Sequence, residues 1–253
     1  LELDVCSSDL SAFARDIAAM PVPEIAPEFV EPGKDFQVAE AAPGRTLYYA
    51  PNPVNNLFSL TFTIDLGRRH DQALGIAARL LDKAGTENLS PEELKKAWYR
   101  IGAEFHVGVG EDETNISLSG LDDHLAEAMA LMAQVLDSAT VPDDALPELK
   151  NIVLQERADA KKQAESLSRA LTLYHRHGEH STNLQRLSNA EVEALEAAPL
   201  LESIAGLLRH KHTVSYVGAL SSDEVQALLS EHLPAAAELK DTPAYAPRPV
   251  RNP

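Results

Sequence analysis

The densest group of side chains able to bind a metal ion lies between positions 175 and 180. Histidines stand at His175, His177 and His180, and Glu179 precedes the last of them. Imidazole nitrogens and carboxylates are common ligands of Zn²⁺. On a helix, however, positions i, i+2 and i+5 point in different directions, so one ion would require the helix to unwind at Gly178. Cationic side chains are also favoured at a helix C-terminus, which explains these histidines without a metal.

Two further groups of polar residues have ordinary structural explanations. His210 and His212 flank a helix-to-strand turn, where we expect them at the surface. The segment Asn52–Asn56 precedes a strand and could present amide groups to a bound peptide, but proline and asparagine are typical of turns, and we predict a turn. Neither a nucleophile-elbow pattern nor a glycine-rich phosphate loop occurs. We therefore predict no catalytic, cofactor-binding or metal-binding residue in this chain.

The composition argues against two classes of partner. The chain has 253 residues and a formal net charge of −17. Binding of nucleic-acid phosphates requires a basic surface, so we expect no nucleic-acid partner. The acidic charge also disfavours anionic membrane surfaces, and no apolar run approaches the length of a membrane span.

The single cysteine lies in a segment that we expect to be dispensable. Residues 4–10 read Asp-Val-Cys-Ser-Ser-Asp-Leu and match one reading frame of a widely used DNA-sequencing adapter. We therefore expect residues 1–10 to be a non-native leader; the alternative is an ordinary disordered one. Cys6 is not expected to be a redox site, and no other cysteine is present. The chain therefore cannot form an internal disulfide, and its cysteine content does not indicate a cellular compartment.

Short strands and amphipathic helices account for most of the chain. Residues 11–35 contain a helical stub at 12–20 followed by several prolines, which indicates a linker. In chain order, the expected elements are strands at 36–39, 46–50 and 57–66, helices at 71–84 and 91–101, strands at 105–109 and 114–118, helices from 122 or 123 to 136 and at 142–165, 167–177, 189–197 and 199–210, a strand at 213–219, and a helix from 221 to about 233.

The arrangement of these elements predicts the fold class. Residues 58–66 alternate between apolar and polar side chains, as in a strand with one buried face. The helix at 71–84 is apolar on most sides, and we expect it to be buried with Gly85 as its C-cap. Since the strands cluster in hairpins, we predict an α+β fold in which a mostly antiparallel sheet is covered by helices on one face.

Several of these sequence segments, in this order, resemble one module of the insulinase/pitrilysin family of zinc peptidases. The resemblance covers about residues 36–233. The segments that carry it are the strand 57–66, the helix end Leu-Leu-Asp-Lys-Ala-Gly-Thr at 80–86, Ser-Pro-Glu-Glu-Leu at 90–94, the hairpin 105–118 and the helix 125–136. Members of the family are built from such modules, which form two halves around a closed chamber.

The resemblance implies where a zinc site would lie, and the chain departs from the family there. One family module carries His-x-x-Glu-His, in which two histidines bind zinc and the glutamate activates water. Counted back from Gly85, this motif falls on Ile76–Leu80, which reads Ile-Ala-Ala-Arg-Leu. The third family ligand corresponds to Glu156. Without the two histidines, we interpret Glu156 as a solvated helix residue and expect zinc only in a catalytic module of the parent protein.

The resemblance leaves two functions open. In the first, residues 36–233 are a non-catalytic module of a zinc endopeptidase that completes the chamber wall and orients peptides. Residues 11–35 and the proline-rich 234–253 would then connect it to neighbouring modules, and the −17 charge could favour basic peptides. In the second, the chain is a free-standing structural subunit resembling the core proteins of respiratory complexes. The sequence does not indicate a location; if the parent is an exported bacterial peptidase, the module would lie in the periplasm or outside the cell.

Overall fold

The computed structural model describes residues 11–21, 26–27, 29–233, 239–244 and 246–251. Contacts divide the chain into two units, residues 1–31 and residues 32–253. The first unit contains helix α1 (Ala12–Ala18), where the Ser11 side chain accepts a hydrogen bond from the Ala14 amide. This helix was expected at 12–20. The expected leader, residues 1–10, lies outside the described residues.

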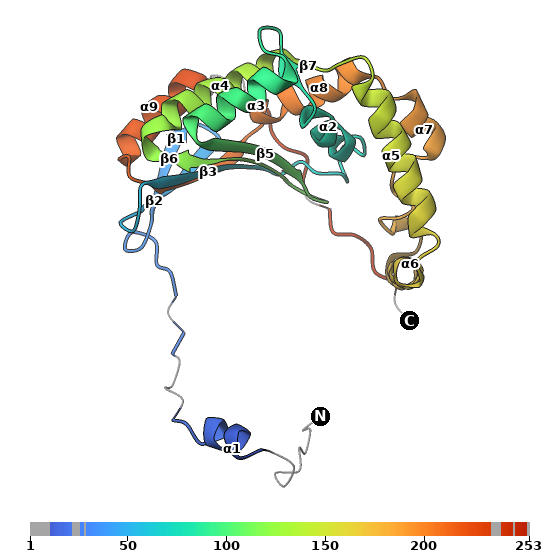
Figure 1. Ribbon diagram of the computed structural model, residues 1–253, viewed down its shortest axis with the longest axis horizontal. Coiled ribbons are helices and arrows are strands. Elements are labelled where there is room, and N and C mark those ends of the chain that lie inside the picture. Colours follow the sequence, from blue (N-terminus) through green and yellow to red (C-terminus); the bar gives the residue numbers. More distant parts are fainter. Residues whose placement is uncertain (1–10, 22–25, 28, 234–238, 245, 252–253) are drawn as a thin grey trace. The chain divides into compact units, whose positions relative to one another are not determined.

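The second unit is built on a mixed sheet, which comprises six strands within the described ranges (Figure 1). Their spatial order is β1 (Gln37–Ala42), β2 (Arg45–Pro51), β8 (His212–Gly218), β3 (Leu57–Ile64), β6 (Thr114–Leu121) and β5 (Ala103–Val109). Strands β2 and β8 run parallel, and the other neighbouring pairs of this described sheet are antiparallel. The predicted mostly antiparallel α+β fold is confirmed.

Helices cover one face of this sheet, and further helices continue beyond its end (Figure 1). Those over the sheet are α2 (Leu74–Leu81), α3 (Pro91–Ile101), α4 (Leu125–Ser138) and α9 (Ser222–His232), with α8 (Ala197–Ala205) packed on α2. Those beyond it are α5 (Ala145–Ala160), α6 (Ala164–His177) and α7 (Asn189–Ala194). No helix among the described residues is long and apolar enough to cross a bilayer.

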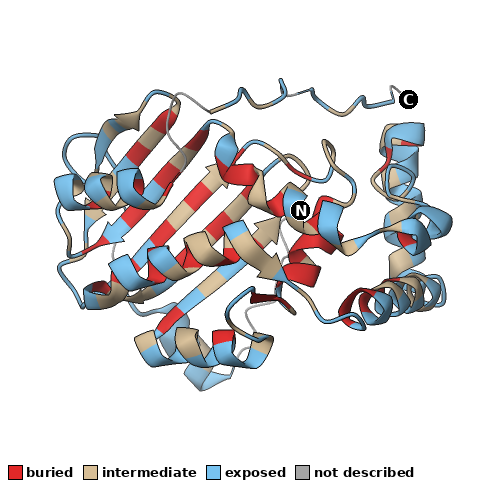
Figure 2. Ribbon diagram, turned by 90° about the horizontal axis from the view of Figure 1, so that it is seen from above, coloured by how far each residue is buried: buried red, intermediate tan, exposed pale blue. Residues whose placement is uncertain are grey.

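The core lies between the sheet and its covering helices, as the buried residues in Figure 2 show. Every second residue of β3 faces this core, and Leu60, Phe62 and Ile64 are fully buried there. Each such side chain contributes roughly 1.5–3 kcal/mol of stability when it leaves water. The predicted burial of α2 is confirmed, because Ala77 and Leu80 have no exposed surface.

No described helix of the second unit covers the opposite face of the sheet (Figure 1). Small polar side chains of β3, β6 and β8 lie in the middle of this face. Thr61 lies across from Ser117, and their hydroxyl oxygens are 3.4 Å apart. Next to them, the Thr63 hydroxyl donates to Asn115 Oδ1 at 2.7 Å. On the other side of β3, Ser215 of β8 pairs with Thr61. This row makes the uncovered face compatible with water.

The predicted role of Gly85 is wrong. Helix α2 ends at Leu81, and Asp82 is its C-cap in a right-handed conformation. Gly85 begins the two-residue strand β4 (Gly85–Thr86), which pairs with β7 (Ala139–Thr140). A side chain at Gly85 would collide with the Leu89 carbonyl, so close backbone approach explains the glycine. A strand of two residues is too short to show a periodicity in the sequence.

Candidate functional site

Helix α2 places the segment Ile76–Leu80 against the core. Ile76 and Leu80 lie one turn apart on the same side of the helix, and both are buried, with 8% and 0% of their surface exposed. Arg79 points away from this apolar side, because its guanidinium reaches helix α5. The two positions one turn apart therefore pack as core residues.

An ion pair joins α2 to α5. The two terminal nitrogens of Arg79 each donate to a different carboxylate oxygen of Glu156, both at 2.8 Å. The hydrogen bonds from Arg79 lower the pKa of Glu156, and those same bonds raise the pKa of Arg79. Both side chains are partly exposed, 41% and 56%, so water screens their attraction. Glu156 is solvated as predicted, but the sequence reasoning did not anticipate its arginine partner.

Comparison with protein families identifies the chain. The model of the insulinase family, peptidase family M16, matches residues 49–186. The chain belongs to this family. A search of curated proteins gave no match.

Several solved protease structures share this fold. A structure described as a peptidase M16 inactive domain from Pseudomonas fluorescens has a TM-score of 0.68 and 21% identity, covering 84% of this chain and 52% of that one. The periplasmic protease PqqL from Escherichia coli has a TM-score of 0.68 and 16% identity, covering 95% and 30%. The ferredoxin protease FusC, in complex with Arabidopsis ferredoxin, has a TM-score of 0.68 and 15% identity, covering 92% and 28%. The chain thus spans between about a quarter and about half of these relatives.

This M16 module lacks the family's zinc motif. The motif positions hold Ile76, Arg79 and Leu80, none of which is a zinc ligand of this family. The family resemblance gives Arg79 the position of the glutamate that activates water and Glu156 that of the third ligand, and in the structure these two side chains form an ion pair. Within the described ranges, no three or more histidine, cysteine, aspartate or glutamate side chains gather closely enough to hold a metal ion.

The histidines near the end of α6 have separate surroundings. Helix α6 ends at His177, whose Nδ1 lies 2.9 Å from the Pro249 carbonyl oxygen. Gly178 follows with a φ of 58°, and the chain then forms a short 3₁₀ turn that includes Glu179 and His180. The chain leaves the helix at its C-cap, Gly178, where a shared metal ion would require the helix to unwind. Within the described structure, however, His175, His177 and His180 form no metal cluster.

The predicted surface position of His212 is wrong. Strand β8 begins at His212, so the inward-facing positions of the strand start there, and the side chain is buried at 5% exposure. Arg45 Nε donates to His212 Nε2 at 3.1 Å, and His212 Nδ1 lies 2.6 Å from the His210 carbonyl oxygen. Burial and, to a smaller extent, the nearby Arg45 charge lower the pKa of His212 to about 4. Hence His212 is a neutral core residue that links β2 and β8.

Residues Asn52–Asn56 form the predicted turn. The Asn52 amide donates to Asn55 Oδ1 at 2.8 Å and to the Leu57 carbonyl at 2.9 Å. Asn55 Oδ1 also accepts from the Leu57 amide, and Asn52 Oδ1 accepts from the Val54 amide. These side-chain groups are occupied within the loop itself, as expected for an asparagine-rich turn.

A cationic pocket lies between the end of the sheet and the loop after α6. Four arginines line it, namely Arg68, Arg69, Arg186 and Arg248, with Glu111 as the one carboxylate among its described lining residues. The pocket has a volume of about 470 Å³, which is in the range of small-molecule and peptide side-chain sites. Sequence reasoning missed it, because Arg186 and Arg248 are far from Arg68 and Arg69 along the chain and only the fold brings them together.

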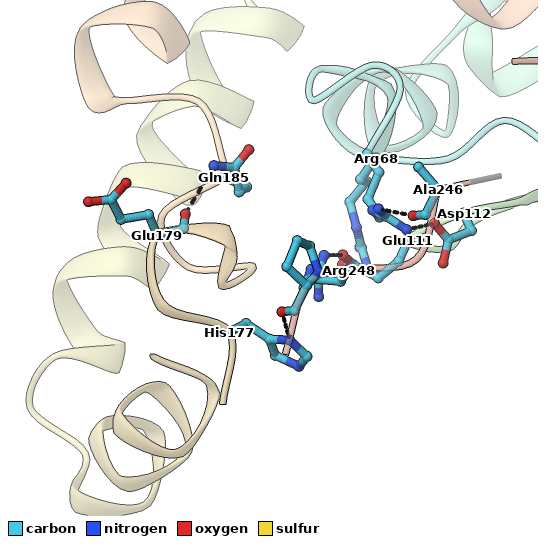
Figure 3. Close-up of polar contacts among 10 residues, drawn as sticks. Arg68, Glu111, Asp112, His177, Glu179, Gln185, Ala246 and Arg248 are labelled. Carbon is cyan, nitrogen blue, oxygen red and sulfur yellow. Dashed lines mark hydrogen bonds and ion pairs between the residues drawn. The ribbon is translucent and has the colours of Figure 1, made fainter. Parts of the chain in front are cut away.

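Ion pairs and backbone contacts position the arginines on the sheet side (Figure 3). Glu111 accepts from Arg68 at 3.1 Å and from Arg248 at 2.9 Å, and Arg69 pairs with Asp112 at 2.7 Å. Arg69 also donates to the Ala246 carbonyl oxygen. The backbone amides of Arg68 and Arg69 donate to the tip of the β5–β6 hairpin at 3.0 and 2.9 Å. These contacts fix the pocket wall.

The segment 246–251, called here the strap, crosses from this wall to α6 (Figure 3). Arg248 of the strap pairs with Glu111, and the Pro249 carbonyl oxygen lies 2.9 Å from His177 Nδ1. The Arg251 amide donates to the Arg176 carbonyl at 2.8 Å, and its guanidinium lies 5.0 Å from the centre of the Tyr174 ring. The strap therefore contributes Arg248 to the pocket and connects its two sides.

Proposed function

We propose that this chain is a non-catalytic module that forms part of the wall of an M16 peptidase chamber and helps to orient peptides for cleavage. The observation that carries the proposal is the combination of a family scaffold with apolar residues, Ile76 and Leu80, at the two zinc-binding positions. The Arg79–Glu156 ion pair joins the same two helices that would share the metal. The module thus keeps the shape of the family without the groups needed for its chemistry.

The uncovered sheet face supports a wall function. Small hydroxyl and amide side chains of β3, β6 and β8 line the middle of it, among them Thr61, Ser117 and Ser215, while the apolar Leu57 and Val217 are exposed toward one end. An apolar face would require another layer of protein to cover it, whereas a polar face tolerates a water-filled space. Such a wall contributes to catalysis by positioning substrate and limiting access of water, and it performs no chemical step itself.

The partner in this proposal is a catalytic module that carries zinc. The chain spans about half of the P. fluorescens structure and less than a third of the PqqL and FusC chains, which leaves room for further modules in proteins of this kind. FusC, a ferredoxin protease, was solved with ferredoxin bound. By analogy, the substrate of the assembled enzyme is a peptide or an unfolded protein segment.

The test is restoration of activity in trans. We expect the purified chain to cleave no peptide and to contain no stoichiometric zinc. The catalytic half of the parent, produced without this chain, should retain its zinc but cleave an unstructured fluorogenic peptide slowly, and adding the chain should restore the rate. One tightly bound zinc per chain would contradict the assignment as non-catalytic. A catalytic half that cleaves at the full rate alone would contradict the wall function.

A further inference from the structure

The charge of the pocket is opposite to that of the molecule. The whole chain carries −17, yet four arginines face a pocket in which Glu111 is the single carboxylate among the lining residues that the structure describes. If Asp112, which pairs with Arg69, is counted as well, the described residues at the pocket comprise four guanidinium groups and two carboxylates. This local excess of positive charge lies in a cavity, and a cavity concentrates the electrostatic field of the charges that line it.

Glu111 is shared, so its charge is divided between two arginines. Arg68 contacts one oxygen of Glu111 at 3.1 Å, and Arg248 contacts the other at 2.9 Å. A guanidinium group has five N–H donors arranged as a planar fork, and a single contact with an oxygen leaves donors for a second carboxylate. The Glu111 side chain therefore holds the two arginines in place without saturating them.

Arg186 provides the opposite wall of the pocket. Its side chain is exposed, and within the described residues it has no ion pair with a carboxylate. Its charge is felt by Arg157, whose pKa is lowered first by burial and second by repulsion from Arg186. Neutral hydrogen-bonding side chains, Thr182 and Asn183, line the pocket beside it. These groups suit an anion that also has polar atoms around its charge.

The wall that carries Arg68 and Arg69 is preorganised. A Cβ atom at Gly67 would lie 2.5 Å from the Glu111 carbonyl oxygen, so glycine allows the backbone before Arg68 to approach the hairpin closely. The amide hydrogen bonds of Arg68 to Gly110 and of Arg69 to Glu111 keep that approach. A preformed set of cationic donors loses little entropy when an anion binds.

We propose that the pocket formed by Arg68, Arg186 and Arg248 binds a carboxylate group of a peptide. Planar guanidinium donors match a carboxylate in bidentate geometry, and the volume of about 470 Å³ admits one or two residues around it. The carboxylate is either the C-terminus of a peptide or an aspartate or glutamate side chain. This inference deepens the proposed function, on which its biological meaning rests. It also differs from the expectation, based on net charge, that basic peptides are favoured.

The test is direct binding to the full chain in the absence of any catalytic partner. Fluorescein-labelled short peptides are compared by polarisation in three forms: a free C-terminus without acidic residues, a C-terminal amide without acidic residues, and a C-terminal amide with one internal glutamate. We expect the first or third form to bind and the second to bind at least tenfold more weakly. Binding of the first form alone assigns the site to C-termini, and binding of the third alone assigns it to side chains. Binding of both assigns it to carboxylates in general.

Matched variants locate the site. Arg186→Gln and Arg68→Gln should each weaken binding roughly tenfold, because each removes a charge-assisted contact. Arg100→Gln changes an exposed arginine on α3, outside the pocket, and should leave binding unchanged. Equal binding of acid and amide peptides, absence of binding at millimolar peptide, or unchanged binding in both pocket variants would overturn the proposal. Because no peptidase is present, a failure here is distinct from a failure of restoration in trans.

Discussion

The absence of the family's zinc motif depends on a few residues and can be read from the sequence. Ile76 and Leu80 take the positions that the family motif gives to two histidines, and no other histidine occurs between His70 and His106. Residue types were sufficient for this prediction, because a zinc site requires particular atoms at particular helical positions. The pairing of Arg79 with Glu156 could not be predicted, since it depends on how α2 and α5 pack.

We expect a modest coupling between Arg79 and Glu156. Their bidentate geometry is favourable, but both side chains are partly exposed, so a double-mutant cycle with alanine should give about 0.5–1 kcal/mol. The exposed helical pair Lys96–Glu92 is the comparison, with an expected coupling of about 0.3–0.5 kcal/mol. Both cycles can be measured by urea unfolding. A coupling of several kcal/mol for Arg79–Glu156 would mean that the pair is much less solvated than the structure shows.

His212 should make the protein sensitive to mild acid. Its folded-state pKa of about 4 lies below its ordinary value of 6.5, so the unfolded chain binds a proton more readily. The contribution of neutral His212 to the free energy of unfolding is complete above pH 6.5. It is lost as the pH falls toward 4, an effect on the order of 3 kcal/mol. We predict that the free energy of unfolding of His212→Gln depends much less on pH across this window.

The control for this prediction is His106→Gln, which changes an exposed histidine on β5. It should leave the pH dependence of the wild-type protein unchanged. If His212→Gln and the wild-type protein lose the same stability between pH 7 and pH 4, then His212 is protonated without penalty and is not buried as described.

At the scale of elements, the sequence predicted those helices and strands that are specified by local sequence patterns. Helix α3 spans Pro91–Ile101 as expected, and a capping box begins it, with the Ser90 amide donating to the Glu93 carboxylate at 2.9 Å. The strand β4 and the strap escaped prediction, because both are extended segments defined by distant partners. Likewise, the cationic pocket required segments that are more than 100 residues apart in the chain.

The strap should stabilise α6, since that helix has no buried residue among those described. Removing residues 246–253 takes away the contacts of Pro249 and Arg251 with the end of α6. We predict faster hydrogen exchange of the α6 amides by mass spectrometry, with little change in α4, whose buried face packs in the core. Equal exchange of α6 in the full and shortened chains would show that the strap has no stabilising effect on it.

At the scale of the molecule, the sheet depends on its last strand. Strand β8 lies between β2 and β3, pairing with β2 in parallel and with β3 in antiparallel register. Val214 and Tyr216 of β8 are fully buried. The fold class was predictable from the sequence, but the central position of β8 was not, because the order of strands in a sheet is set by long-range packing.

This arrangement predicts the smallest fragment that folds. A fragment of residues 32–211 lacks β8, which leaves β2 and β3 with unpaired inner edges and an opened core. We expect it to be insoluble or to lack a cooperative thermal transition, whereas residues 32–233 retain both β8 and α9. Circular dichroism melting distinguishes the two. A cooperative transition in the shorter fragment would mean that the sheet closes without its central strand.

The parallel pairing of β2 with β8 also has a consequence for biosynthesis. Partners such as Leu47 and Val214 are separated by more than 160 residues. A ribosome therefore releases β1, β2 and β3 long before the strand that joins β2 to β3 is translated. Until then, the nascent chain exposes apolar β3 residues and two strand edges, the features that favour aggregation and binding by chaperones. Folding of this module is thus expected to be completed only late in its synthesis, and slow translation before residue 212 would prolong its most vulnerable stage.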